Sequence, residues 1–129
     1  MRFETKGDLK NELEIIQKIS RGNKYIKLGP NDIDFLIIDK AYIEIKKYNY
    51  YSFDLNYFFV SLIKLVKMQA KDRVLPCYLF LQFIDNLFYI RCIDVKGYIN
   101  YTGRKKRDGS TNDKELILLA EKNNFKIFK

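Results

Sequence analysis

The feature that most constrains the fold is a pair of strand patterns that each turn back on themselves. The first pair of runs spans residues 32–38 and 41–48, and the second spans residues 77–84 and 87–93. β-Branched and aromatic residues dominate these runs, as is typical of strands. Asp39-Lys40 and Asp85-Asn86 separate the partners, and Asp and Asn favour tight turns. We therefore expect two β-hairpins.

Two further segments carry apolar residues at helical spacing. In the first, residues 7–21, Asp8 can cap the N-terminus and Gly22 ends the helix. Its apolar face consists of Leu9, Leu13, Ile16 and Ile19. The second spans residues 53–71, and Pro76 ends the connection that follows it. Its expected buried face consists of Leu55, Phe58, Phe59, Leu62, Leu65 and Val66.

The remaining segments complete the order of elements. Residues 24–28 are expected to form a short strand, and residues 102–114 one long polar loop. In the last third we expect edge strands at 98–101 and 125–128, with 114–123 as a helix or a strand. The order α-β-β-β-α-β-β plus C-terminal elements predicts a mixed α/β fold, a sheet flanked by helices. The 129 residues are expected to form a single domain, residues 1–129.

The residue types that are absent exclude several kinds of chemistry. The chain has no histidine, which removes Ser-His-Asp and Cys-His triads and His-ligated zinc. Its two cysteines, Cys77 and Cys92, are too few for a disulfide scaffold or a four-thiolate zinc site. Both lie on the apolar face of the second hairpin and are expected to be buried thiols. Hydrolysis by this chain would need carboxylates, lysine and a hard metal ion.

The net charge favours an acidic partner. Twenty-four Lys and Arg against 16 Asp and Glu give +8, which points first to nucleic acid and second to an anionic membrane surface. The richest apolar stretch, Tyr57 to Val66, is interrupted by Ser61 and Lys64, so no membrane span is expected. No signal segment opens the chain. We expect a soluble cytoplasmic protein, in the host cytoplasm if it is viral.

A group of charged residues in and near the first hairpin is a candidate catalytic site. Glu44 and Lys46 are two apart on a strand and share a face, but chance alone predicts about one Glu-x-Lys in this composition. Asp34 lies ten residues before Glu44, on the preceding strand. Glu12 falls within the apolar stripe of the first helix, where a carboxylate needs a compensating cation or hydrogen bonds. The alternative is an exposed strand face with a cross-strand ion pair.

The turn of this hairpin decides whether the two carboxylates meet. A two-residue turn at Asp39-Lys40 would place Asp34 opposite Ile45, on the wrong face. The even spacing between residues 34 and 44 therefore requires a loop with an odd number of residues, or a bulge. We predict one there.

These residues resemble the PD-(D/E)XK nuclease superfamily, whose restriction-endonuclease-like core runs helix, three strands, helix, strand. The resemblance covers about residues 8 to 92 and extends to small phage-type and resolvase-like members. It implies divalent metal, Mg²⁺ or Mn²⁺, on Asp34 and Glu44, with Ile45 and Glu12 as further ligands. Lys46 would position the attacking water. One departure is Ile33, where the family's motif has a proline before the Asp; Asp32 shares the parity of Asp34 and is a substitute ligand or a loop cap.

Several residues are candidates for contacts with nucleic acid. Each has a plainer interpretation, as a solvated surface side chain or as part of the core. The candidates are Lys64, Gln82, Arg104, Lys105, Lys106 and Arg107, and the aromatic rings of Tyr48, Tyr50 and Tyr51, which could stack on bases or on a partner subunit.

We therefore predict a metal-dependent endodeoxyribonuclease that hydrolyses phosphodiester bonds in DNA. A single domain without a separate recognition module favours structure-selective over sequence-specific cleavage, and relatives suggest a homodimer, with a Holliday-junction resolvase as the most pointed version. RNA remains an open substrate. The alternatives are a non-catalytic nucleic-acid-binding protein with the nuclease fold, and an accessory subunit with an aromatic docking surface.

Overall fold

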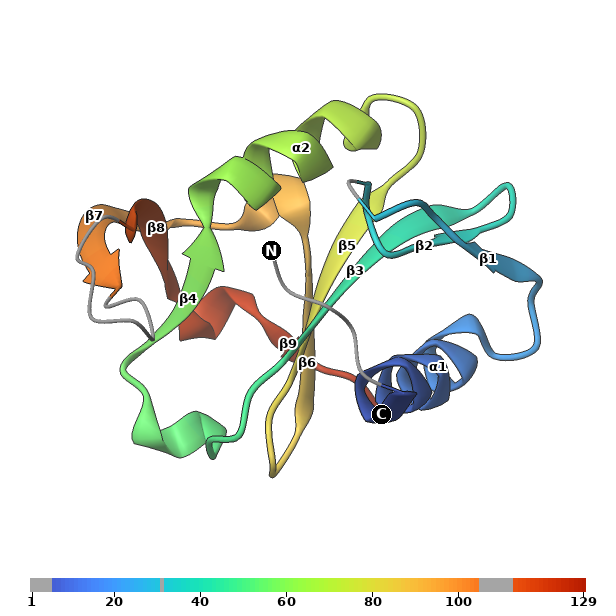
Figure 1. Cartoon of the computed structure of the whole chain (residues 1–129), viewed down its shortest axis with the longest axis horizontal. Helices are drawn as coiled ribbons and strands as arrows, with labels where there is room; N and C mark the ends of the chain where they lie inside the picture. The colour runs from blue at the N-terminus through green and yellow to red at the C-terminus, as the bar shows by residue number, and fades with distance from the viewer. Residues whose placement is uncertain (1–5, 31, 105–112) are drawn as a thin grey trace.

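The computed structural model describes residues 6–30, 32–104 and 113–129, with side chains for 11–30, 32–100 and 116–129. Two helices and two sheets form a mixed α/β fold (Figure 1). The helices are α1 (Lys6–Ser20) and α2 (Leu62–Asp72). The strands are β1 (Tyr25–Lys27), β2 (Phe35–Ile37), β3 (Ala41–Lys47), β4 (Tyr57–Ser61), β5 (Cys77–Gln82), β6 (Leu87–Arg91), β7 (Gly97–Arg104), β8 (Asp113–Glu121) and β9 (Lys126–Ile127).

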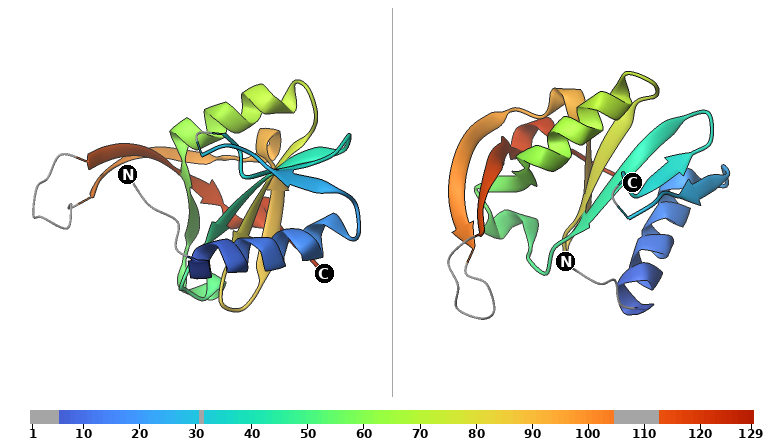
Figure 2. Two further views of the ribbon diagram at one scale, coloured as in Figure 1. Left: turned by 45° about the vertical axis from the view of Figure 1, so that its right-hand side comes forward. Right: turned by 45° about the horizontal axis from the view of Figure 1, so that its top comes forward.

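The larger sheet has the order β1-β2-β3-β5-β6-β9 and is antiparallel except between β3 and β5, which are parallel. The two predicted hairpins are its centre, β2–β3 and β5–β6. The smaller sheet has the order β4-β8-β7 and is antiparallel throughout. Its β7–β8 ribbon reaches away from the rest of the molecule (Figure 2). Since a parallel pair needs a crossover, β4 and α2 together make the connection from β3 to β5.

Each helix covers one face of the larger sheet. Ile16 and Ile19 of α1 pack with Ile43, Ile45 and other side chains of one face. On the other face, Leu65 and Met68 of α2 pack with strands of both sheets. That second core contains Leu79, Leu81 and Ile90 of the larger sheet and Phe58, Val60, Leu118 and Ala120 of the smaller one. Successive side chains of β3 therefore alternate between an α1 core and an α2 core.

The first helix and its end follow the predicted pattern. It begins at Lys6, so Asp8 lies within its first turn rather than at its cap. Arg21 and Gly22 have positive φ angles of 50° and 87°, which end the helix after Ser20. At the other end of the chain, Arg21 donates a hydrogen bond of 2.9 Å to the carbonyl of Lys129 and lies over the ring of Phe128. The C-terminal residues are thereby fixed against α1.

The predicted second helix is wrong over its first half. A short 3₁₀ turn, Ser52–Asp54, and strand β4 replace it, and α2 begins only at Leu62. Phe58 is fully buried and Phe59 is 45 % exposed, which is the alternation of a strand. Val66, expected in the core, is 59 % exposed. The strand forms because β8, some 60 residues later, supplies its hydrogen-bonding partner.

The C-terminal third resolves the remaining alternatives. Residues 113–121 are strand β8, and β7 extends to Arg104, so the predicted loop at 102–114 is too long at both ends. No helix among the described residues is both long and apolar enough to cross a membrane.

Candidate active site

The turn between β2 and β3 sets the register of the site. Three residues, 38–40, connect the strands; the Lys40 N–H donates a hydrogen bond of 3.0 Å to the Ile37 carbonyl. Asp39 has φ = 64°, a left-handed conformation that Asp tolerates. The ladder pairs Ile37 with Ala41 and Phe35 with Ile43. The prediction of an odd-residue loop is confirmed, and the register, continued by one residue, sets Asp34 across from Glu44.

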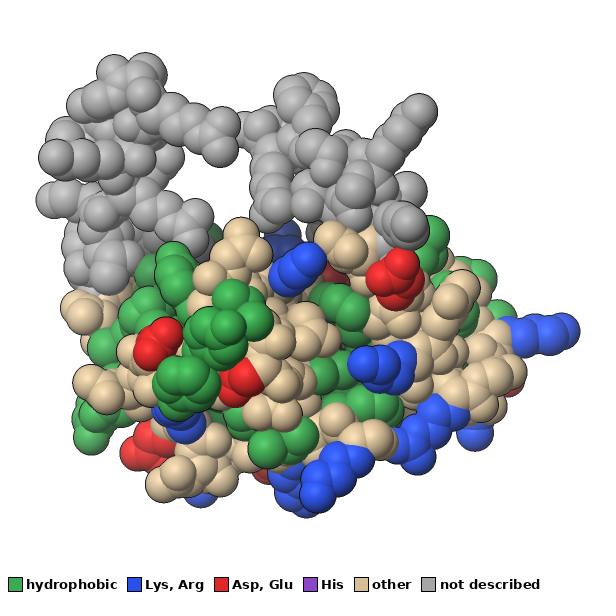
Figure 3. All heavy atoms as spheres, turned by 90° about the horizontal axis from the view of Figure 1, so that it is seen from below, with side chains coloured by type: hydrophobic (Ala, Val, Ile, Leu, Met, Phe, Trp, Pro, Cys, Tyr) green, Lys and Arg blue, Asp and Glu red, His purple; other side chains and the backbone are tan. Residues whose placement is uncertain are grey.

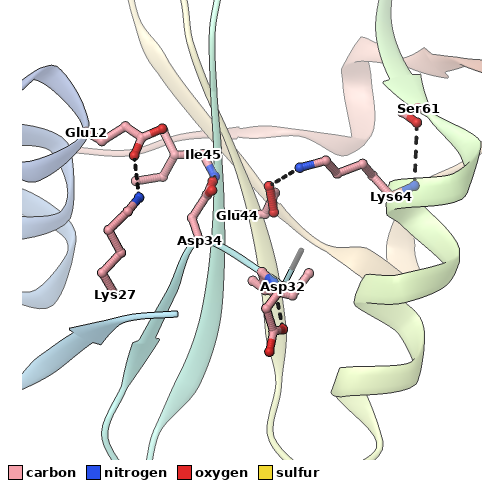
Figure 4. A network of polar contacts seen from close by, with 9 residues as sticks. Glu12, Lys27, Asp32, Asp34, Glu44, Ile45, Ser61 and Lys64 are labelled. Carbon is pink, nitrogen blue, oxygen red and sulfur yellow. Dashed lines mark hydrogen bonds and ion pairs between the residues drawn. The ribbon is translucent and has the colours of Figure 1, made fainter. Parts of the chain in front are cut away.

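Asp34 and Glu44 form the centre of the site. Asp34 lies just before β2, and its Oδ2 accepts a hydrogen bond of 2.8 Å from the backbone N–H of Ile45 (Figure 4). The side chain of Ile45 is buried on the α1 face, so Ile45 can reach the site only through its backbone. The charge of Asp34 acts on Glu44 strongly enough to raise its pKa. The register of β2 and β3 and this charge effect together place the two carboxyl groups near enough to interact.

Glu44 is buried between β3 and the first turn of α2. Only 4 % of it is exposed, so the alternative of a solvated strand face is wrong for this residue. Burial, followed by the charge of Asp34, raises its pKa from 4.5 to about 7 against the opposing effect of Lys64. Its Oε1 accepts a hydrogen bond of 2.9 Å from Lys64 Nζ, whereas its buried Oε2 has no hydrogen-bond partner in the structure as described.

Lys64 reaches Glu44 from the first turn of α2. Ser61 caps this helix, its hydroxyl accepting from the Lys64 N–H at 3.5 Å. Burial alone would lower the pKa of Lys64, but the carboxylates of Glu44, Asp34 and Glu12 outweigh it, and the pKa is raised. The sequence predicts Lys64 only as a nucleic-acid contact, and the alternative for Glu44 is an ion pair across strands; neither assigns Lys64 to Glu44, because the predicted helix begins too early. The signal was available: Ser61 after a β-rich run, directly before helical spacing.

The two other acidic candidates, Glu12 and Asp32, each pair with a lysine other than Lys64. Glu12 points from α1 to Lys27 of β1, with 3.1 Å between its Oε2 and Lys27 Nζ (Figure 4). It lies at the edge of the apolar stripe with 21 % of its side chain exposed. Asp32 accepts a hydrogen bond of 2.7 Å from the Ile33 N–H and pairs with Lys71 at 3.3 Å. Asp32 thus caps the loop, while Glu12 acts on the centre through its charge.

Lys46 follows Glu44 on the same face of β3, two residues further along the strand. It is exposed, unlike Glu44, so it stands at the solvent side of the site. The next residue, Lys47, is also exposed but points to the other face, so Lys47 is a suitable control position for Lys46.

The predicted nucleic-acid contacts do not all gather at this site. Lys64 lies in it, as described above. Gln82 pairs with Lys47 and therefore faces the α1 side, where its Nε2 donates a hydrogen bond to the Phe83 carbonyl. Arg104 ends β7, and nothing is described of its side chain; Lys105, Lys106 and Arg107 lie outside the described residues. Cys77 and Cys92 are buried thiols, as predicted.

The tyrosines after β3 divide into two kinds. Tyr48 is half-buried, stacks on Phe83 with centroids 5.1 Å apart, and donates a hydrogen bond to the Phe59 carbonyl. Tyr50 and Tyr51 are 55 % and 44 % exposed; Tyr51 stacks on the exposed ring of Phe53, and the Tyr50 carbonyl accepts a hydrogen bond from the Ile84 N–H beside the β5–β6 turn. Seen from below, hydrophobic and acidic side chains mix on the left of the view, whereas Lys and Arg lie mainly on the right, the side on which Figure 1 shows α1 (Figure 3).

The donor set suits a hard divalent cation. Glu44 Oε2 is a buried oxygen with an open acceptor site, beside a second carboxylate from Asp34. Mg²⁺ commonly binds through one or two carboxylates and keeps several waters. Over the described part of the chain, no three His, Cys, Asp or Glu side chains converge as a metal site. Two carboxylates, with water or substrate completing the shell, therefore suit a divalent cation that retains several waters.

The family comparison agrees with this geometry. A family model described as "Phage putative PDDEXK endonuclease" matches residues 1–127. The chain belongs to this family. The mixed, mostly antiparallel sheet and two helices of this PD-(D/E)XK chain are compatible with a restriction-endonuclease-like fold. No curated protein and no solved structure matches it. The family membership supports nuclease activity on a nucleic-acid substrate.

Proposed function

We propose that the chain is a divalent-metal-dependent endonuclease that hydrolyses phosphodiester bonds in DNA. The observation that carries the proposal is the pairing of Asp34 with Glu44, which is 4 % exposed and has one oxygen without a hydrogen-bond partner. Burying such a group costs folding free energy unless a ligand compensates it. A site retained at that cost is a candidate for function.

Asp34 and Glu44 would hold Mg²⁺ or Mn²⁺. Ile45 can add only a backbone group, and Glu12 is an outer residue whose charge reinforces the site. The bound ion would supply positive charge for the phosphate and lower the pKa of a water molecule. The Ile45 N–H keeps Asp34 aimed into the site, so the carboxylate needs little reorganisation when substrate arrives.

Lysines supply the remaining functions. Lys46, exposed on the face of Glu44, is placed to hold and orient the attacking water and to accept or return its proton. Lys64 offers an ammonium group to a phosphate oxygen, as do Arg104 and the basic residues Lys105, Lys106 and Arg107 along the backbone of the substrate. Gln82, on the far face, would contact nucleic acid only away from the site.

The substrate is proposed to be recognised by structure rather than sequence. The 129-residue chain carries no separate recognition module among its described residues, and its charge of +8 favours backbone contacts. A homodimer would let each subunit cut one strand of a branched substrate. RNA is the competing substrate class, and the proposed place of action is the cytoplasm, the host's if the protein is viral.

The test is cleavage of plasmid, single-stranded and four-way-junction DNA, and of RNA, with Mg²⁺, Mn²⁺ or EDTA. Wild type, Lys46→Ala and the matched control Lys47→Ala are compared. Metal-dependent cleavage that falls at least about 100-fold in Lys46→Ala and stays near wild type in Lys47→Ala supports the proposal. Salt-sensitive binding without cleavage of any substrate would overturn it in favour of a non-catalytic nucleic-acid-binding protein.

A further inference from the structure

Lys64 places a positive charge beside the carboxylates that are proposed to bind the metal. Its Nζ lies 2.9 Å from Oε1 of Glu44, and Asp34 and Glu12 are close enough to act on its charge. One ammonium group thus lies among three carboxylates. The contact with Glu44 is a hydrogen-bonded ion pair, whereas Asp34 and Glu12 act on Lys64 through their charges, and Glu12 also pairs with Lys27.

The same contact opposes a divalent ion. An ion bound by Glu44 would lie close to the ammonium, and two like charges a few ångströms apart in a partly buried site repel strongly. The single negative charge of Glu44 cannot neutralise both the metal ion and the Lys64 ammonium. Metal binding must therefore either tolerate this repulsion or displace Lys64.

Displacement is structurally easy. The side chain of Lys64 is 54 % exposed, and it extends from the first turn of α2 on a flexible four-carbon stem. The ammonium can move into solvent without disturbing the core, because the buried side chains of α2 are Leu65 and Met68, not Lys64.

We propose that Lys64 is a built-in counter-ion that competes with the divalent metal for Glu44, so that it lowers the metal affinity of the site. The inference rests on the proposed function, because it requires Asp34 and Glu44 to bind metal. In the metal-free protein Lys64 neutralises a buried carboxylate. In the metal-bound protein the ion pair between Lys64 and Glu44 is broken. Toward the metal, Lys64 is thus a positioning residue that tunes the affinity of the site, and its ammonium, once released from Glu44, is available for the phosphate contact proposed above.

A structural role and a competing role predict opposite results. If Lys64 only supports the fold of the site, its removal loosens Glu44 and weakens metal binding. If Lys64 competes, its removal strengthens metal binding, because an obstacle to the ion disappears. A gain in affinity is an outcome that damage to the fold does not produce.

The test is calorimetric titration of Mg²⁺ into the full chain without nucleic acid, at about pH 9 so that Glu44 is ionised in every variant. The variants are Lys64→Met and, in case Met perturbs folding, Lys64→Gln, each checked by circular dichroism. Lys67→Met is the matched control: it removes the same charge one turn later on α2, from another exposed lysine. Lys64→Arg keeps the charge and should restore the wild-type affinity.

We expect Lys64→Met and Lys64→Gln to bind Mg²⁺ about tenfold more tightly than wild type, and Lys67→Met to bind like wild type. Equal or weaker binding by both Lys64 variants, with wild type binding Mg²⁺, would overturn the inference and leave the proposed function intact. If neither wild type nor any variant binds Mg²⁺, or Mn²⁺ in the same titration, the metal-dependent function itself is overturned, and the inference with it.

Discussion

Asp34 is fixed by a backbone group of the strand that carries its partner carboxylate: the N–H of Ile45 lies 2.8 Å from Asp34 Oδ2. The hydrogen bond crosses from β3 to the residue before β2, and it joins the two halves of the site. With this hydrogen bond in place, Asp34 remains close to Glu44, and the negative charge of Asp34 contributes to the raised pKa of Glu44. Geometry and electrostatics at this centre therefore depend on one another and can be separated by substitution.

The substitution Asp34→Asn separates the geometry of the site from its electrostatics. The amide oxygen can still accept from Ile45, so the hairpin should keep its structure, but the negative charge is lost. We expect cleavage to fall at least about 100-fold and the pKa of Glu44 to move down from about 7. Nucleic-acid cleavage assays and carboxyl-carbon NMR titration measure the two effects. Asp39→Asn, in the turn of the same hairpin, is the control and should leave both unchanged; an unshifted Glu44 pKa in Asp34→Asn would contradict the coupling.

Glu44→Gln should reduce activity and raise stability. The folded protein holds the Glu44 proton up to about pH 7, whereas the unfolded chain releases it near 4.5. The native state thus binds more protons in this window, so the free energy of unfolding falls as the pH rises from 4.5 to 7. Above that window the buried charge is a cost that the glutamine lacks.

We expect Glu44→Gln to be more stable than wild type by about 2 kcal/mol at pH 8 and close to wild type at pH 4, in urea unfolding without metal. Cleavage should be lost at both pH values. Glu14→Gln, an exposed position on α1, is the control. A destabilised Glu44→Gln at pH 8 would mean that the ion pair with Lys64 outweighs the cost of burial.

Both hairpins, the first helix and the mixed α/β class were predictable because they depend on local patterns. The position of Asp34 relative to Glu44 followed from strand parity once an odd-residue turn was assumed. Strand β4 was not predictable in this way. Its sequence Tyr-Phe-Phe-Val-Ser is a short apolar run that suits either a helix or a strand, and its partner β8 is far away in the sequence.

That one error also concealed the partner of Glu44. With β4 taken as helix, Lys64 falls in the middle of a long amphipathic segment. With α2 beginning at Leu62, Lys64 falls in its first turn, where it reaches β3. The contact joins residues 20 positions apart through the packing of a helix on a sheet, and no spacing rule describes it. Candidate ligands could be found from the sequence, whereas their counter-ion required the tertiary structure.

Asp72, at the end of α2, connects this helix to β5 and β6 through hydrogen bonds. It accepts two hydrogen bonds from Arg91, at 3.0 and 2.8 Å, and one of 2.9 Å from the Cys77 N–H, and 8 % of its side chain is exposed. The hydrogen bond from Arg91 is the largest cause of the lowered pKa of Asp72. A lowered pKa means that stability is present at neutral pH and is lost as the pH falls through the folded-state pKa.

Asp72→Ala should therefore cost about 2 kcal/mol of unfolding free energy at pH 7, because it leaves the buried Cys77 N–H without its acceptor. The loss should shrink under acidic conditions, where wild type also loses the charge. Urea denaturation across pH measures it, with Asp94→Ala as an exposed control. A loss that is independent of pH would assign the effect to packing rather than to the carboxylate.

The β7–β8 ribbon depends on a residue without a side chain at Gly97. A Cβ there would lie 1.9 Å from the backbone carbonyl oxygen of Leu119, so the two strands would have to separate. Since β8 also pairs with β4, which leads directly into α2, the disturbance should reach the element that carries Lys64. We expect Gly97→Ala to cost about 3 kcal/mol of unfolding free energy, measured by urea denaturation. Gly29→Ala is the matched control, because a Cβ at Gly29 meets nothing within 4 Å, and it should change stability by less than about 0.5 kcal/mol. Equal stability of the two variants would show that β7 is free to shift away from β8, and would contradict the close packing of this ribbon.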